Sequence, residues 1–148
     1  MAVTRIARSA LLPYARENIF SLISDIEAYP QYMDGCTAAR ILLAENGFVE
    51  ARLELSKAGI KQSFTTRNQI IEPQTILMEL VEGPLQSLSG RWVFDALNAD
   101  ACKVSLDLHF EMDGKLASLA AGKLFETVAG SLVDSLCKRA HSLYRVQP

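Results

Sequence analysis

The feature that most constrains this chain is a long region in which apolar and polar residues alternate with a period of two. The alternation runs from about residue 37 to residue 112 and is clearest in the segment "CKVSLDLHFEM", which begins at Cys102. Successive side chains of a β-strand point to opposite faces of a sheet, so the pattern predicts strands with one buried and one solvated face. A solvated face is typical of an antiparallel sheet.

Turn signals divide this region into about six strands. Glycine, proline and asparagine mark chain reversals, because each favours a backbone conformation that a strand interior avoids. The predicted turns lie at Glu45–Gly47, Lys57–Gly59, Glu72-Pro73, Gly83-Pro84 and Asn98–Asp100.

The segments on either side of this region have other periods. Val3–Leu11 reads as a first strand, and apolar residues then recur at helical spacing over Ile19–Ile26. Pro30 ends a second short helix. From Lys115 to roughly Arg145 an apolar stripe with helical spacing returns, which predicts one long C-terminal helix.

These elements predict an α+β fold in which every apolar face is covered. A curved antiparallel sheet of about six to seven strands would wrap around the long C-terminal helix, with two short helices after the first strand. A chain of 148 residues is long enough to bury a sizeable core. Residues 1–148 are therefore expected to form a single domain.

Composition excludes several classes of function. No apolar run reaches the roughly 18 residues that a membrane-spanning helix needs, and the expected location is the cytoplasm. The net charge is −2, and the 15 basic residues are spread along the chain. Because sequence-independent binding to nucleic acid neutralises several phosphates together, this dispersion argues against a dedicated DNA or RNA surface.

Candidate catalytic and metal-binding groups are sparse. His109 and His141 are isolated, and Cys36, Cys102 and Cys137 lie far apart without the spacing of a metal site. The expectation is free thiols, no metal, no catalytic residue and no enzymatic activity.

Five collinear stretches resemble a known family. They are "SDIEAYPQYM", "FTTRNQI", "LVEGPLQSLSGRWVFDAL", "CKVSLDLHFEM" and "KRAHSLY". Together they resemble the ribosome-association toxin and coenzyme-Q-binding branch of the START-like, helix-grip superfamily. The resemblance implies a hydrophobic tunnel between the sheet and the C-terminal helix. It also implies three activities known among relatives: ubiquinone binding in support of respiration, inhibition of ribosomal subunit joining, and polyketide cyclase or dehydrase chemistry.

The inward-facing residues of the predicted elements form the expected tunnel wall. They are Phe64, Thr66, Asn68, Met78, Leu80, Trp92, Phe94, Leu106, Leu108, Phe110, Phe125 and Leu132. Trp92 and Phe94 are expected beneath the long helix. Gly83, Pro84 and Leu85 would form one side of the tunnel mouth, with Gly90 letting the next strand bend, and a facing lip would comprise Tyr29, Pro30, Tyr32 and Met33.

The expected function is non-enzymatic binding of an isoprenoid quinone such as ubiquinone, or of another isoprenoid lipid, with no protein cofactor. An empty apolar tunnel of about 300 Å³ would cost roughly 7 kcal/mol, so such a tunnel is collapsed, wetted or occupied. Thr66 and Asn68 would supply polar contacts to a head group. A carrier of this kind needs transient membrane contact, for which Tyr29, Tyr32, Met33 and Leu85 are the candidates.

Two alternatives remain open. A toxin-like inhibitor of subunit association would bind the large ribosomal subunit through its outer surface, with Arg139, Arg145 and the Tyr29-Pro30 lip as contacts. A polyketide cyclase or dehydrase would need an acid or base facing the substrate. Glu79 alternates with apolar neighbours and is expected to point away from the core.

Overall fold

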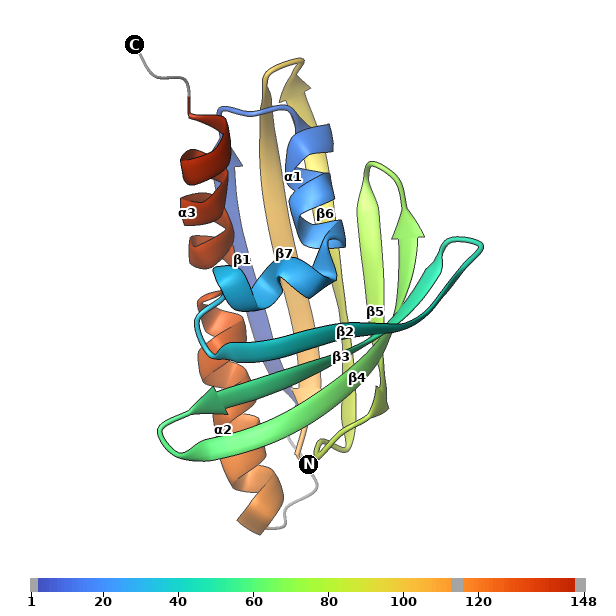
Figure 1. The fold of residues 1–148 in the computed structure, drawn as a ribbon, viewed down its shortest axis with the longest axis vertical. Helices are drawn as coiled ribbons and strands as arrows, with labels where there is room; N and C mark the ends of the chain where they lie inside the picture. Colours follow the sequence, from blue (N-terminus) through green and yellow to red (C-terminus); the bar gives the residue numbers. More distant parts are fainter. Residues whose placement is uncertain (1–2, 113–115, 146–148) are drawn as a thin grey trace.

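Seven antiparallel strands form a single bent sheet in the computed structural model, which describes residues 3–112 and 116–145, the side chains of 116–119 excepted (Figure 1). The strands are β1 (Thr4–Leu12), β2 (Cys36–Glu45), β3 (Phe48–Lys57), β4 (Ile60–Ile71), β5 (Thr75–Glu82), β6 (Ser87–Asn98) and β7 (Ala101–Glu111). Their order across the sheet is β1-β7-β6-β5-β4-β3-β2. The six strands predicted from the alternation and the separate first strand are confirmed.

The helices confirm most of the prediction. α1 (Arg16–Ser24) and the 3₁₀ helix η1 (Ile26–Gln31) follow β1, as two short helices should. The C-terminal helical segment consists of α2 (Leu116–Gly130) and α3 (Leu132–Tyr144), with a break at Ser131. The Ser131 hydroxyl donates a hydrogen bond to the Val128 carbonyl oxygen at 3.0 Å. This bond competes with regular helical pairing, since serine readily bonds to nearby backbone.

One part of the inner face of the sheet packs against α2, and other helices cover the rest of that face. Figure 1 shows β2, β3 and β4 crossing in front of α2, while α1 lies over β6 and β7. Phe94 on β6 contacts Phe20 of α1, with 5.2 Å between ring centroids. The prediction that Phe94 lies beneath the C-terminal helix is therefore wrong, because α1 covers that part of the sheet.

The two faces of the sheet differ as the alternation predicts. Phe94, Val104 and Phe110 on the inner face are fully buried. On the outer face, the Arg5 guanidinium and the Asp107 carboxylate form an ion pair at 3.0 Å. The hydrogen bond from Arg5 lowers the pKa of Asp107 below its ordinary value. Among the described residues, no helix is long and apolar enough to span a membrane.

Gly90 allows β6 to pack directly on β7. A Cβ atom built on Gly90 would lie 2.3 Å from Leu108 Cδ2 and 2.9 Å from the Asp107 carbonyl oxygen. The glycine is thus required by this close approach, whereas the sequence had indicated a bend.

We predict that Gly90→Ala lowers the free energy of unfolding by about 1–3 kcal/mol, the usual cost of inserting a carbon atom into a packed site. Urea denaturation followed by circular dichroism measures the change. Ser89→Ala, on the exposed neighbouring position, is the matched control and should remain within about 0.5 kcal/mol of the parent. A Gly90→Ala value inside the control range would contradict the close approach.

Candidate functional site

A β-bulge separates the end of β5 from β4. The register pairs Thr65 with Glu82 but the next residue, Thr66, with Leu80, which leaves Val81 as an extra residue on β5. Bulges of this kind bend a strand and end its pairing. Residues 60–64 of β4 therefore pair with β3 and have no partner in the β4–β5 register.

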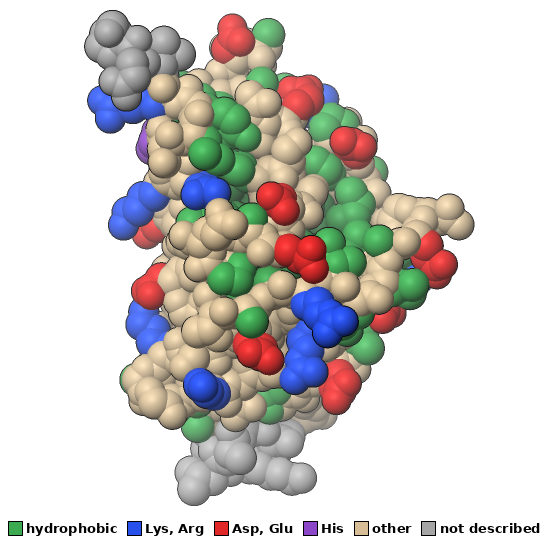
Figure 2. All heavy atoms as spheres, in the orientation of Figure 1, with side chains coloured by type: hydrophobic (Ala, Val, Ile, Leu, Met, Phe, Trp, Pro, Cys, Tyr) green, Lys and Arg blue, Asp and Glu red, His purple; other side chains and the backbone are tan. Residues whose placement is uncertain are grey.

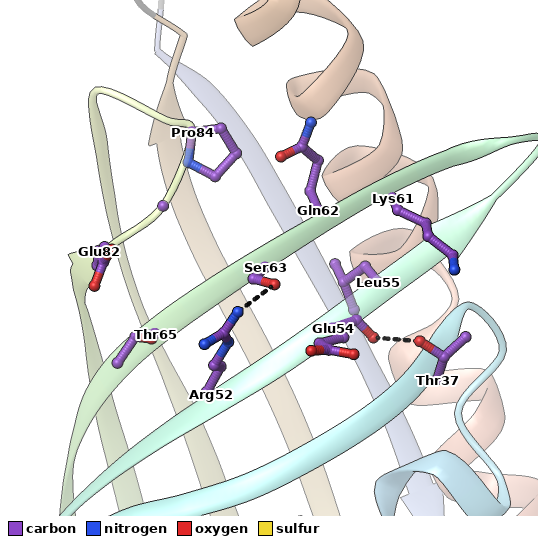
Figure 3. Close-up of a pocket in the computed structure, with 11 residues that line it drawn as sticks. Thr37, Arg52, Glu54, Leu55, Lys61, Gln62, Ser63, Thr65, Glu82 and Pro84 are labelled. Atoms are coloured by element: carbon purple, nitrogen blue, oxygen red, sulfur yellow. Dashed lines mark hydrogen bonds between the residues drawn. The ribbon is translucent and has the colours of Figure 1, made fainter.

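A pocket of about 580 Å³ lies at this point, between β4 and the connection from β5 to β6. Gly83 and Pro84 line it from the connection, and Gln62 and Leu55 line it from β4 and β3. Figure 3 shows Gln62 and Leu55 pointing from their strands toward the helix behind them. We call this hollow the β4–β6 pocket. Most of its lining residues lie on the outer face of the sheet, whereas Gln62 and Leu55 point toward the side that faces α2 (Figure 3).

The outer rim of the β4–β6 pocket is polar and balanced in charge. Two basic residues, Arg52 and Lys61, line it together with two acidic ones, Glu54 and Glu82. Arg52 Nη2 donates a hydrogen bond to Ser63 Oγ at 3.2 Å (Figure 3). A rim with equal numbers of both charges favours a neutral polar group over a phosphate or an ammonium ion.

Hydroxyl groups complete the rim. Thr37 Oγ1 donates a hydrogen bond to the Glu54 carbonyl oxygen at 3.2 Å, and this bond ties the start of β2 to β3. Thr65 also lines the pocket, with 9% of its surface exposed. The pocket therefore offers several fixed hydrogen-bonding groups close to solvent.

An aromatic cluster lies directly behind the Gly83 side of the pocket. A Cβ atom on Gly83 would lie 3.1 Å from Phe64 Cδ1 and 3.2 Å from Leu80 Cδ1. The Phe64 ring centroid is 5.3 Å from that of Phe125 on α2, which is itself 4.9 Å from that of Phe110. We call Phe64, Phe110 and Phe125 the α2 aromatic cluster. Gly83 thus packs directly against Phe64 and Leu80, and a ligand in the pocket reaches the α2 aromatic cluster only if these side chains move.

Asn68 is a polar group with an unusual environment. It lies on the inner face of β4 between Val49 of β3 and Met78 of β5 and is only 6% exposed. Among the described residues, no group bonds to its buried Oδ1 atom. An unpaired buried acceptor costs about 1–3 kcal/mol, so a hydrogen-bonding ligand would remove a penalty.

The inner face near Asn68 remains partly open. Ile41, Val49, Ile70 and Met78 are half-buried against the core. Figure 2 shows hydrophobic side chains exposed between α1 and the β4–β5 hairpin, where no helix covers the sheet. Exposed apolar surface of this kind is characteristic of binding surfaces.

The structure places the expected tunnel-wall residues on the inner face but in two groups. One contains the α2 aromatic cluster with Leu80. The other contains Trp92 and Phe94, whose ring centroids lie 6.2 Å apart, and Phe94 lies against Phe20 of α1. Of the remaining expected residues, Leu106 and Leu108 are buried, whereas Thr66, Met78 and Leu132 are half-buried.

The expected mouth residues also separate. Gly83 and Pro84 line the β4–β6 pocket, whereas Leu85 is buried. Tyr29 lies on η1 and Met33 follows that helix. Both are buried, and neither lines the β4–β6 pocket.

A hydrogen bond and a cation–π contact explain the positions of the η1 tyrosine Tyr29 and of Tyr32, which follows η1. The Tyr29 hydroxyl donates a hydrogen bond to the Ile23 carbonyl, and burial raises the pKa of Tyr29 well above its ordinary value. Tyr32 lies beneath the Arg139 guanidinium, with 5.4 Å from Cζ to the ring centroid, and Pro30 is exposed. The expectation that Met33 and Leu85 form a membrane-contacting lip is corrected, because these side chains belong to the core.

Sequence reasoning missed the polar rim. Arg52 alternates with inward residues on a strand predicted to have one solvated face, and the alternation alone does not place it with Ser63 and Glu82. The bulge at Val81 gives them a shared pocket, and pairing register between distant segments leaves no local signal.

Other titratable residues lie elsewhere. His109 Nε2 lies 3.2 Å from Asp107 Oδ1 on the outer face, and Cys36, Cys102 and Cys137 are free thiols. Burial raises the pKa of each of these thiols. Within the part of the chain that the structure describes, no three His, Cys, Asp or Glu residues form a group that would hold a metal ion.

Solved structures define the class of protein. The chain superposes on the Zhui aromatase/cyclase from Streptomyces sp. R1128 with a TM-score of 0.85 and 17% identity, over 98% of both chains. It superposes on a START superfamily protein from Mycobacterium smegmatis with a TM-score of 0.79 and 23% identity, over 94% of this chain and 98% of that one. The fold is therefore a START-like helix grip.

Sequence comparison identifies the family. The profile described as "Polyketide cyclase / dehydrase and lipid transport" matches residues 12–137, and the chain belongs to this family. The ribosome association toxin RatA of Escherichia coli K12 is 42% identical over 97% of this chain and 91% of its own. The mitochondrial coenzyme Q-binding protein COQ10 homolog B of Xenopus laevis is 21% identical over 93% of this chain and 58% of its own.

We predict that Asn68→Leu raises the free energy of unfolding by about 1 kcal/mol, because it removes an unpaired buried amide at similar volume. Chemical denaturation measures the change. Gln69→Leu, at the exposed next position, is the control and should shift stability by at most about 0.5 kcal/mol. A loss of stability in Asn68→Leu would mean that the amide is already satisfied.

Proposed function

We propose that this protein binds, without chemical conversion, a small molecule with a long apolar tail and a neutral polar head, and that an isoprenoid quinone such as ubiquinone is its ligand. The observation that carries the proposal is the β4–β6 pocket, whose polar rim adjoins Phe64 and Leu80 through Gly83. The pocket's own lining is mostly polar, and the apolar part of the proposed site lies behind it at Phe64 and Leu80.

The two parts of the site match the two parts of such a molecule. The isoprenoid tail packs against the α2 aromatic cluster, where each buried methylene contributes about 0.8 kcal/mol. The head group meets hydroxyl and amide groups at the rim or at Asn68. The Asn68 amide accepts from a quinol hydroxyl and, after a half-turn about its terminal bond, donates to a quinone carbonyl.

The charge of the rim supports a neutral head. Arg52 and Lys61 are offset by Glu54 and Glu82, so an anionic phospholipid gains little from this surface. The relative named as a coenzyme Q-binding protein supports the same ligand class. Catalysis is not part of the proposal, because the described lining residues include no histidine or cysteine.

We predict that Gly83→Val weakens binding of a short-chain ubiquinone by about tenfold or more, since the added side chain collides with Phe64 and Leu80 and displaces this wall of the pocket. Isothermal titration calorimetry measures the dissociation constant, and tenfold corresponds to about 1.4 kcal/mol. Gln86→Val adds a similar side chain at an exposed position of the same connection and should bind as the parent does.

Two results would contradict this proposal. Equal affinity of Gly83→Val and Gln86→Val would exclude entry beside Gly83. Failure of the parent protein to bind any quinone or isoprenoid lipid would reject the ligand class itself.

A second candidate function is interference with ribosomal subunit association. The 42% identity to the ribosome association toxin RatA over almost the whole chain favours it. It would use the outer surface of the protein, and both functions can therefore belong to one chain.

We predict that overproducing the protein in bacteria depletes 70S particles and increases free subunits, as measured by sucrose-gradient sedimentation. Phe94→Asp, which places a charge at a fully buried position and prevents folding, is the control at matched expression. An unchanged gradient with the folded protein would count against this candidate.

A further inference from the structure

A second hollow of about 530 Å³ lies where the end of α3 meets the connection from β1 to α1. Its lining residues are Pro13, Tyr14, His141, Tyr144 and Arg145, and we call it the α3-end pocket. In Figure 1 the end of α3 lies at the top of the molecule, whereas the β5–β6 connection lies near the bottom. The two pockets are therefore separate sites.

Three aromatic rings form the α3-end pocket. The Tyr14 ring centroid is 5.5 Å from that of His141 and 5.8 Å from that of Tyr144, and both pairs are inclined rather than parallel. His141 is exposed and the two tyrosines are half-buried, so part of this cluster is accessible to a further flat ring.

Hydrogen bonds hold these rings in place. The Tyr14 hydroxyl lies 2.6 Å from His141 Nδ1, and the Tyr144 hydroxyl donates to the Asn18 carbonyl oxygen at 3.3 Å. Rings that are fixed before binding lose little conformational entropy when a ligand arrives. His141 is exposed, so core packing does not account for the polar groups of this cluster.

The chemistry of the lining restricts the ligand. Arg145 is exposed and disfavours a cation, and none of the five described lining residues is acidic. The hydroxyl and imidazole groups disfavour a purely apolar chain. A flat aromatic group attached to an anion satisfies the rings, the hydrogen-bonding groups and the arginine together, and an unpaired nucleotide is such a group.

We propose that the α3-end pocket binds an unpaired nucleotide of single-stranded RNA, with its base stacked on the tyrosine and histidine rings and its phosphate against Arg145. Arg145 is the one arginine or lysine among the described lining residues, so the electrostatic contribution to binding is small, in agreement with the dispersed charge of the chain. The inference rests on the ribosome-association candidate for its biological setting, whereas binding to isolated RNA does not.

Fluorescence anisotropy with a labelled single-stranded RNA of about 12 nucleotides tests the inference, with a duplex of the same length for comparison. We expect the single strand to bind more tightly than the duplex. Combining Tyr14→Leu with Tyr144→Leu should weaken binding by about tenfold, and Tyr14→Phe should weaken it less because the ring remains. Arg145→Gln should reduce the slope of the logarithm of the binding constant against the logarithm of the salt concentration by about one, the contribution of one phosphate contact. Arg40→Gln, an exposed arginine on β2, is the matched control.

Each outcome bears on the inference. Absence of binding up to about 100 µM, the weak end of non-specific affinity, would overturn it. Equal affinity of the parent and the doubly substituted variant, or equal binding of duplex and single strand, would also overturn it. Circular dichroism determines whether the double variant is folded. If it is unfolded, the effect of Arg145→Gln on binding still tests the inference.

Failure of the inference is distinguishable from failure of the functions proposed above. If the protein depletes 70S particles but binds no RNA strand, another surface contacts the ribosome and only the α3-end assignment falls. Quinone binding depends on Gly83 and is measured independently, so loss of one activity leaves the other testable.

Discussion

The structure depends on covering the apolar inner face of one bent sheet. Helices cover the inner face of β1, β7 and β6. The part of the sheet formed by β2 to β5 bends around α2, and its inner face packs on that helix. Cover is incomplete where β5 bends away from β4 at the Val81 bulge and where the β4–β5 hairpin extends beyond α1. Apolar side chains remain accessible at these two places. The candidate ligand site therefore follows from how the sheet closes, without a dedicated motif.

The strands could be predicted from sequence because alternation depends only on neighbours along the chain. β7 follows the period of two most closely, whereas register shifts interrupt the pairing of β2, β5 and β6. The break at Ser131 follows Gly130, a residue that allows a helix to bend, but the apolar stripe continues through it and no proline marks the end of α2. The Val81 bulge was hidden, because Leu80, Val81 and Glu82 show no local irregularity and the slip arises from pairing with β4.

The same distinction applies to the candidate site. The inward positions Phe64, Leu80 and Asn68 follow from alternation, but which helix covers each position is set by packing between distant segments. Phe94 consequently lies under α1 although the sequence indicated the C-terminal helix. Tyr29 was expected at an opening and instead supports η1 from the core.

Nuclear magnetic resonance of the labelled protein, titrated with a short-chain ubiquinone, tests the central claim most directly. The account predicts saturable chemical-shift changes that cluster on Gln62, Phe64, Leu80, Gly83 and Phe125, where the pocket adjoins α2. Shift changes confined to the outer face of β1, β7 and β6, or no saturable change at all, would contradict it.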